Sequence, residues 1–235
     1  MTTKNDSKQD YFDKIKEIKV SDEKPEPLTD QNFFTVAKER SSIRHYDPEH
    51  KMTESELREI LETAILAPSS SNIQPWRFLV IQDQSLKEQL LPIANNQQQI
   101  VDASAIIAVL SDVEGYKKAE DIYGGIVKAG RMTEEIKDFY VNQIHQHYGN
   151  LSPAEATRVA MIDGGLVSMQ LMLAAKAKGY DTVPMGGFDP VQFVKLFHVP
   201  AQYEPVMLIA IGKATQAGFG KVRLSVDEVT SWNKY

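Results

Sequence analysis

The sequence predicts an α+β fold in which helices flank a mixed or antiparallel sheet. Two short apolar runs, residues 105–110 and 206–211, have the length and unbroken hydrophobicity of buried strands. A longer run, residues 159–177, is apolar on nearly every side of a helix, which is typical of a helix in a core or at a subunit interface. Strands and helices are interspersed without strict alternation, and this favours α+β over a doubly wound parallel sheet.

Capping patterns mark the predicted helix starts. Thr53-Glu54-Ser55-Glu56 is a capping box, and apolar residues at helical spacing follow it until Pro68 ends the helix. Ser152-Pro153-Ala154-Glu155 places serine at the N-cap and proline at the first helical position, and so opens the long apolar helix. Asp189-Pro190 repeats that pattern. We also expect a short helix over 33–37 and a strand over 78–81.

Composition limits the class of protein. The chain has 235 residues, a net charge of −6 and no cysteine. The negative charge disfavours nonspecific binding to nucleic acid. The lack of cysteine excludes disulfides, thiol catalysis and thiolate metal centres. The N-terminus is too polar for a signal peptide, and no apolar run approaches the roughly 20 residues of a membrane span, so the sequence predicts a cytoplasmic protein.

The sequence predicts a polar N-terminal extension over 1–31 and a single domain over 32–235. The first thirty residues mix Lys, Asp and Glu and end near two prolines. Four apolar residues between 11 and 18 could line a short amphipathic helix, but a loosely ordered extension is the better prediction.

Two short clusters of cations form the main candidate site. One is Arg-Ser-Ser-Ile-Arg at 40–44, and the other is the pair Lys221 and Arg223. Arginine forks and serine hydroxyls match the oxygens of a phosphate group. Each cluster also has an ordinary interpretation, as the basic end of a helix or as a charged edge strand. If the fold brings the clusters together, they form a site for a phosphate-bearing ligand.

Other motifs in the sequence bear on the binding of ligands and metals. Adjacent glycines in Met185-Gly186-Gly187-Phe188 would let a planar ligand approach the backbone, although for this string alone a plain turn between two helices is the better interpretation. No glycine-rich dinucleotide fingerprint or Walker loop is present. His145 and His147 lack a nearby third ligand, so the sequence predicts no metal site. Met169 and Met172 are predicted core residues.

Set in order, these segments resemble the FMN-dependent nitroreductase family from about residue 33 to residue 232. The strings that carry the resemblance are 40–44, 67–76, 184–189 and 221–224, of which Ala-Pro-Ser-Ser-Ser-Asn-Ile-Gln-Pro-Trp at 67–76 is the most specific. The sequence looks closest to small bacillus-type NAD(P)H nitroreductases. The resemblance implies an intertwined homodimer with two FMN sites at its interface, in which residues beyond about 215 reach across the partner subunit.

The resemblance also implies a role for each motif residue. Residues that would hold the FMN phosphate come from the two cationic motifs: Arg40, Ser41, Ser42, Lys221 and Arg223. Residues that would approach the flavin ring are Arg44 at the N1–O2 edge, Asn96 and Gln99 at the pyrimidine edge, and the loop Pro184, Met185, Gly186 and Gly187, whose glycine amides would face N5. Residues that the partner subunit would contribute are Pro68, Ser69, Ser70 and Asn72.

The activity implied by the resemblance is oxidoreduction. NADH or NADPH would reduce FMN, and the flavin would then reduce a nitroaromatic or related electron-poor acceptor in a ping-pong cycle of two-electron transfers. No side-chain acid or base is predicted, because flavin N5 carries the chemistry and Arg44 tunes it. Phe139, Tyr140 and Tyr148 would either cover the acceptor or serve in packing.

Three alternatives stay open at this point: reduction of quinones, enones, azo compounds or free flavin on the same fold; an FMN-binding sensor without turnover; and a flavin-free interaction domain. Two departures from the family pattern bear on them. Many family members carry lysine where Gln99 stands and glutamate where Gly186 stands. These departures leave the acceptor and the redox potential open.

Overall fold

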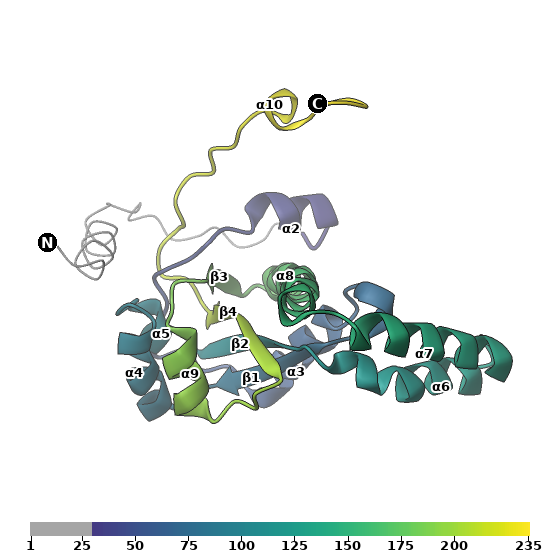
Figure 1. The fold of residues 1–235 in the computed structure, drawn as a ribbon. Helices are drawn as coiled ribbons and strands as arrows, with labels where there is room; N and C mark the ends of the chain where they lie inside the picture. The colour runs from purple at the N-terminus through teal and green to yellow at the C-terminus, as the bar shows by residue number, and fades with distance from the viewer. Residues whose placement is uncertain (1–29) are drawn as a thin grey trace, which may run out of the picture.

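The computed structural model describes residues 30–235 and is shown in Figure 1. The predicted N-terminal extension therefore lies outside the described residues. Four antiparallel strands form a sheet in the order β1-β2-β4-β3. Their bounds are β1 (Trp76–Ile81), β2 (Ala105–Asp112), β3 (Asp181–Met185) and β4 (Tyr203–Gly212). The three predicted strands are confirmed and each extends further than expected.

Strand β3 was not predicted, and its place in the sheet explains why. It has five residues and contains Pro184, which lacks a backbone donor and disfavours a strand in the middle of a sheet. The strand order places β3 at an edge of the sheet, where a missing donor is tolerated. The interpretation of Met185–Phe188 as a turn between two helices is therefore wrong, because this segment leaves β3 and enters α9 (Pro190–Phe197).

Helices cover both faces of the sheet, so the α+β fold class is confirmed. Side chains alternate along each strand, and in β2 Ile107 faces one apolar cluster while Ile106 faces the other. On the first face lie α3 (Glu54–Ala64) and α8 (Pro153–Ala177). On the second face lie α4 (Gln84–Ile93), α5 (Gln99–Asp102) and α9.

Helix α8 is the central helix of the fold. Ser152 caps it and Glu155 completes the capping box, as predicted. The helix lies close to the sheet, since a Cβ added at Gly164 would be 2.7 Å from a methyl group of Val206. In length and composition α8 could cross a membrane, which amends the expectation that no apolar run reaches that length. Because 56% of its apolar window is buried within the fold, α8 has the burial of a core helix.

Not every apolar residue of α8 faces the core. Met172 is buried as predicted, but Met169 is 42% exposed, so its assignment to the core is wrong. Met169, Ile162 and Leu166 recur at helical spacing and form an exposed apolar stripe on α8. This stripe is available for contact with another molecule.

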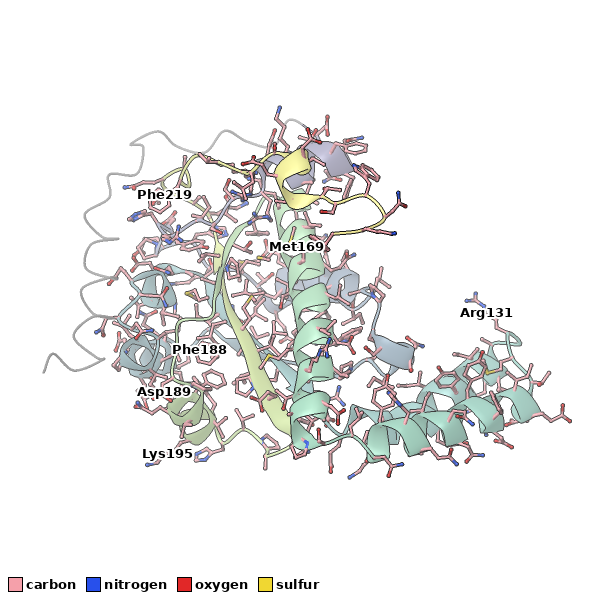
Figure 2. The ribbon with its side chains drawn as sticks, turned by 45° about the horizontal axis from the view of Figure 1, so that its top comes forward. Arg131, Met169, Phe188, Asp189, Lys195 and Phe219 are labelled. Atoms are coloured by element: carbon pink, nitrogen blue, oxygen red, sulfur yellow. The ribbon has the colours of Figure 1, made fainter. Side chains whose placement is uncertain are left out.

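Two further helices project from the body as a hairpin, α6 (Ala119–Lys128) and α7 (Glu134–Gly149) (Figure 1). Arg131 lies at the tip of this hairpin (Figure 2). The two helices share a small apolar cluster with Ile73. Lys137 of α7 joins them through an ion pair with Glu120 of α6 at 2.6 Å. The base of the hairpin adjoins the short helices η1 (Ser70–Asn72) and η2 (Gly115–Lys118).

The two ends of the described chain differ in how they pack against the body. The predicted helix before Arg40 is confirmed as α2 (Phe33–Glu39), which packs beside α8. After β4, residues 215–221 lie against residues 38–45, and residues 222–235 then run away from the body and contain only the short helix α10 (Val226–Val229) (Figure 1). This segment exposes a series of apolar side chains: Val222, Leu224, Val226, Val229 and Trp232.

Candidate functional site

The fold brings the two cationic clusters together. Residues 42–47 run alongside the start of β3 and the chain that follows β4. Ser42 forms a parallel bridge with Thr182, and the Ile43 amide donates to the Thr182 carbonyl at 3.1 Å. On the other side the Thr215 amide donates to the His45 carbonyl at 3.0 Å.

Gly218 allows the final approach between the clusters. A Cβ added there would lie 3.0 Å from the Ser42 carbonyl oxygen and 3.1 Å from the Ser41 Cβ. Any other residue would press against the backbone of the first cluster. The segment that carries Lys221 and Arg223 can therefore lie directly against residues 41–43.

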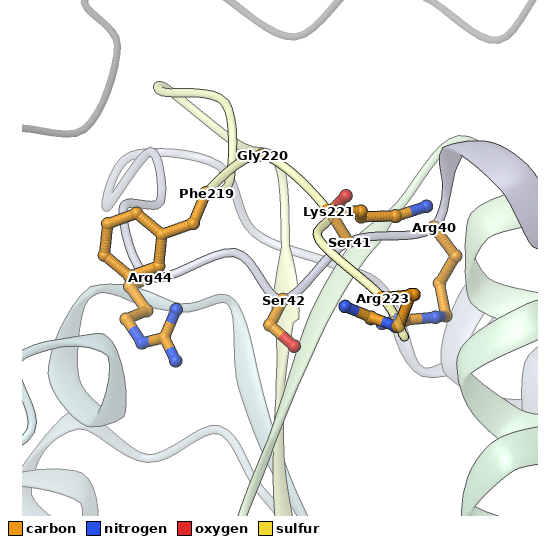
Figure 3. Close-up of a pocket in the computed structure, with 8 residues that line it drawn as sticks. All are labelled: Arg40, Ser41, Ser42, Arg44, Phe219, Gly220, Lys221 and Arg223. Carbon is orange, nitrogen blue, oxygen red and sulfur yellow. The ribbon is translucent and has the colours of Figure 1, made fainter. Parts of the chain in front are cut away.

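The two clusters enclose a pocket of about 170 Å³ (Figure 3). Its lining comes only from these two segments: Arg40, Ser41, Ser42, Arg44, Phe219, Gly220, Lys221 and Arg223. Arg44 and Phe219 lie on one side, with the guanidinium 5.0 Å from the centre of the ring. Arg40, Lys221 and Arg223 lie on the other side, and Ser42 lies between them. The pocket therefore has a cationic end and an end with one cation and one aromatic ring.

Electrostatics at the cationic end favour an anion. Burial and then the charge of Arg223 lower the pKa of Arg40 from its usual value. Burial, Arg40, Arg223 and Lys176 likewise lower the pKa of Lys221. Within residues 30–235 none of Arg40, Lys221 and Arg223 forms an ion pair with a carboxylate. A bound anion would relieve their mutual repulsion. The ordinary interpretation of Lys221 and Arg223 as a charged edge strand is wrong, because residues 215–225 form no strand.

A second polar region lies at the other end of β3. Strand β3 rises about 3.3 Å per residue, so its end at Met185 lies about 10 Å from Thr182 beside the pocket. There Asn95 and Gln97 both donate to the Gly187 carbonyl, Gln97 at 3.1 Å. Gln99 is buried and donates to Gln97 at 3.1 Å and to the Met185 sulfur at 3.4 Å. This network joins the segment before α5 to the loop after β3.

The residues predicted to act in this second region differ in their exposure to solvent. Gln99, Met185 and Gly187 meet in one hydrogen-bonded network, whereas Asn96 and Gly186 are exposed. Asn96 has a left-handed backbone with φ of 52°. Gly186 does not need one, and a Cβ added there would meet no atom within 4 Å. Pro184, on β3, pairs with Ile209 of β4.

The string Pro68–Asn72, in contrast, does not reach the pocket within one chain. Ser70 is held by Asp163 of α8 through two contacts, from its amide at 3.1 Å and from its hydroxyl at 3.0 Å. Lys176, whose charge acts on Lys221, lies on the same helix. At about 1.5 Å per residue, α8 separates Asp163 from Lys176 by about 20 Å. Pro68, Ser69, Ser70 and Asn72 thus lie well away from the cationic end.

Tyrosines of the α6–α7 hairpin hold the neighbouring residue of this loop. The hydroxyl of Tyr123 donates to the Ser71 carbonyl at 3.1 Å, and that of Tyr148 donates to the Ser71 hydroxyl at 3.0 Å. Tyr148 thus contacts the loop of its own chain. Phe139 and Tyr140 are 60% and 46% exposed on α7 and are available to a ligand.

Four residues of the regions described above were not predicted from the sequence: Phe219 in the pocket, Asn95 and Gln97 at the second region, and Asp163, which holds the loop. Phe219 lies between two glycines just ahead of the predicted cations, which was a usable signal. Asp163 is the only acidic residue in the apolar run 159–177, and it could have been found on that ground. Asn95 and Gln97 carry no such signal, because nothing in a polar run distinguishes them.

Comparisons with known proteins identify the family of this chain. The model of the Nitroreductase family matches residues 37–213. The chain is 46% identical over 204 residues to "Putative NAD(P)H nitroreductase YdgI" of Bacillus subtilis, covering 86% of this chain and 97% of that protein. It is 32% identical over 192 residues to the "CLA biosynthesis enone reductase" of Lactiplantibacillus plantarum, covering 80% of this chain and 88% of that protein.

A solved structure shows the same likeness in three dimensions. The crystal structure of a nitroreductase from Exiguobacterium sibiricum, described as putative and in complex with FMN, is 43% identical to this chain. The two superpose with a TM-score of 0.84, covering 88% of this chain and 100% of that one. On the family match and these relatives, the chain belongs to the nitroreductase family.

Proposed function

We propose that the protein is an FMN-dependent oxidoreductase that uses NADH or NADPH to reduce nitroaromatics or related electron-poor acceptors. The observation that carries this proposal is the placement of a cationic pocket at one end of β3 and a polar loop about 10 Å away at the other. A mononucleotide with a phosphate at one end and a flat ring at the other suits this layout. The FMN-bound relative supports the same ligand.

The phosphate end fits an FMN phosphate by charge and by donors. Arg40, Lys221 and Arg223 supply cations that lack carboxylate partners within residues 30–235, and Ser42 supplies a hydroxyl between the two ends of the pocket. Charge-assisted hydrogen bonds to phosphate are among the strongest that side chains form. We assign these four residues to the phosphate, with Ser41 beside them in the lining.

Backbone amides and side-chain amide groups would make most of the contacts with the flavin ring. Arg44 lies apart from the other cations and would stabilise negative charge at the N1–O2 edge. The amides of Gly186 and Gly187 would face N5, and Asn96 and Gln99 would face the pyrimidine edge. When bound, FMN supplies the redox chemistry, reduced by NAD(P)H and reoxidised by the acceptor in a ping-pong cycle. The protein contributes position and a fixed electrostatic field.

A second copy of the chain would complete the site. The apolar stripe of α8 and the extended C-terminal segment expose large side chains that a dimer would bury. The loop Pro68–Asn72 is held at Asp163, about 20 Å along α8 from Lys176, whose charge acts on Lys221 at the cationic end of the same chain. In an intertwined homodimer this loop would serve the site of the partner subunit.

Cofactor content and reduction kinetics test the proposal. The purified protein should be yellow, release FMN on denaturation, and lose its flavin absorbance when NADH or NADPH is added without oxygen. A colourless preparation that takes up no added FMN would overturn it. Reduction by NAD(P)H without reoxidation by any acceptor would instead favour a sensor.

A second candidate activity is enone reduction, which the relative from Lactiplantibacillus plantarum favours. Stopped-flow reoxidation of the reduced protein by a nitroaromatic, a quinone, an enone and an azo compound would rank the acceptors. The cytoplasmic location and the single-domain organisation over 32–235 stay predictions.

A further inference from the structure

Asp163 is a buried carboxylate that the proposed function does not use. It lies in the middle of α8 and is fully buried. Within residues 30–235 no cation pairs with it, and its partners are the amide and the hydroxyl of Ser70. A buried carboxylate without a cation is costly, because water solvates the charge far better than an apolar interior does. Its two contacts to Ser70 offset that cost.

Ser70 belongs to a loop with an unusual backbone. Ser71, Asn72 and Gln74 all have positive φ, between 46° and 51°, although none of them is glycine. Such conformations persist only where surrounding contacts hold them. The contacts here come from three helices: Asp163 of α8, Tyr123 of α6 and Tyr148 of α7. Asp163 is the only charged member of this set.

The hydrogen bonds of Ser70 also define what it can offer a ligand. Both its amide and its hydroxyl donate to Asp163, and its carbonyl accepts from the Ile73 amide at 3.1 Å. Ser70 therefore keeps no free donor. Ser69 and Asn72 flank it, and Asn72 is exposed.

We propose that Asp163 is a positioning residue for the flavin: it fixes Ser70 as the anchor of the loop, and the flanking Pro68, Ser69 and Asn72 make the contact. This inference rests on the proposed function, in which the loop serves the flavin site of the partner subunit, and it places the contact at the flavin ring. It also revises the role expected of Ser70, from ligand contact to support.

Flavin titration of the full-length protein tests this role. We would compare Asp163→Asn, Ser70→Ala and the double variant by fluorescence titration with FMN and with riboflavin, which lacks the phosphate. The matched control is Ser168→Ala, a buried hydroxyl on the same helix that donates to the Gly164 carbonyl at 2.6 Å and does not contact the loop. Asp163→Asn should weaken the binding of both ligands by about tenfold, since the negative charge that strengthens the hydrogen bonds from Ser70 is lost. Ser168→Ala should change neither by more than about twofold.

The pattern across ligands and variants separates positioning from general damage. Equal losses for FMN and riboflavin place the effect at the ring and not at the phosphate. Ser70→Ala should add little to Asp163→Asn, because the two residues act through one contact. The inference is overturned if Asp163→Asn binds FMN as the wild type does, or if Ser168→Ala loses as much. If the wild type binds neither flavin, the proposed function fails and this inference fails with it.

Discussion

The two ends of the candidate site are built in opposite ways. At the ring end, Asn95 and Gln97 both donate to the Gly187 carbonyl in the loop after β3, and Gln99 donates to Gln97. At the phosphate end, Arg40, Lys221 and Arg223 repel one another, and within residues 30–235 each of Lys221 and Arg223 donates only to a nearby carbonyl. The fold preorganises the ring end through its hydrogen bonds. At the phosphate end the fold holds three cations close together despite their mutual repulsion.

The two ends should therefore contribute to different free energies, one to that of folding and the other to that of ligand binding. Residues of the ring end should contribute to folding, because their loss leaves buried groups without partners. Residues of the phosphate end should contribute to ligand affinity and little to folding, because without an anion they are destabilising neighbours. Variants in which FMN affinity and the free energy of unfolding are both measured test this contrast.

The largest effect is expected from the double variant Lys221→Ala/Arg223→Ala. It removes two charge-assisted donors to the phosphate, so FMN should bind about a thousandfold more weakly. Riboflavin affinity should be unchanged, and fluorescence titration measures both. Lys234→Ala is the control, an exposed cation on the same terminal segment outside the pocket. Equal losses for FMN and riboflavin would contradict the assignment.

A smaller effect is expected from Arg44→Ala. If Arg44 stabilises the charge of reduced flavin at the N1–O2 edge, turnover should fall by about a hundredfold and the flavin should become harder to reduce. Redox titration and steady-state kinetics measure the two quantities. Arg58→Ala, which removes an exposed arginine paired with Glu54, should alter neither. An unchanged reduction potential in Arg44→Ala would rule out this role.

Stability of the protein without flavin tests the ring end directly. Asn95→Ala removes the hydrogen bond to the Gly187 carbonyl and places alanine at φ of 55°, so the free energy of unfolding should drop by about 2 kcal/mol. Urea denaturation measures this quantity. Asn95→Gly, which tolerates that φ, should lose less. Lys221→Ala should leave the free energy of unfolding unchanged. A drop comparable to that of Asn95→Ala would contradict the proposed difference between the two ends.

The smallest effect is a pH dependence at the phosphate end. The folded protein lowers the pKa of Lys221 below its usual 10.5 through burial and the charges of Arg40, Arg223 and Lys176. The charged form is thus disfavoured by folding, and this cost falls as pH rises through the lowered pKa towards 10.5. The flavin-free protein should gain stability over that window relative to Lys221→Gln. Added FMN should abolish the gain, and its persistence would argue against anion binding at Lys221.

Local signals in the sequence predicted much of the fold. The capping patterns at Thr53, Ser152 and Asp189 each open the expected helix, because a cap depends only on neighbouring residues. Strand β3 was missed because its proline is acceptable only at a sheet edge, and edge position is a property of the whole sheet. The exposure of Met169 was missed for the same reason, since helical spacing does not say which side of a buried helix lies open.

The candidate site was predicted in part for a related reason. The two cationic motifs were identified, but their meeting depends on the bridge between Ser42 and Thr182, which joins segments far apart in the chain. The support of Ser70 by Asp163 likewise spans distant residues and has no pattern at the level of spacing. Single residues with suitable chemistry can be chosen from sequence, whereas the contacts that orient them require the tertiary fold.

The open space at Gly186 has a consequence for how this site can diverge. The position needs no special backbone conformation, and a side chain there would meet no neighbouring atom within 4 Å at its Cβ. Its amide, the group proposed to serve the ligand, would be kept by any residue except proline. A single substitution could therefore place a carboxylate, an amide or a ring beside the acceptor without disturbing the core. At position 186, selection could change the substrates of this protein at little cost to its folding.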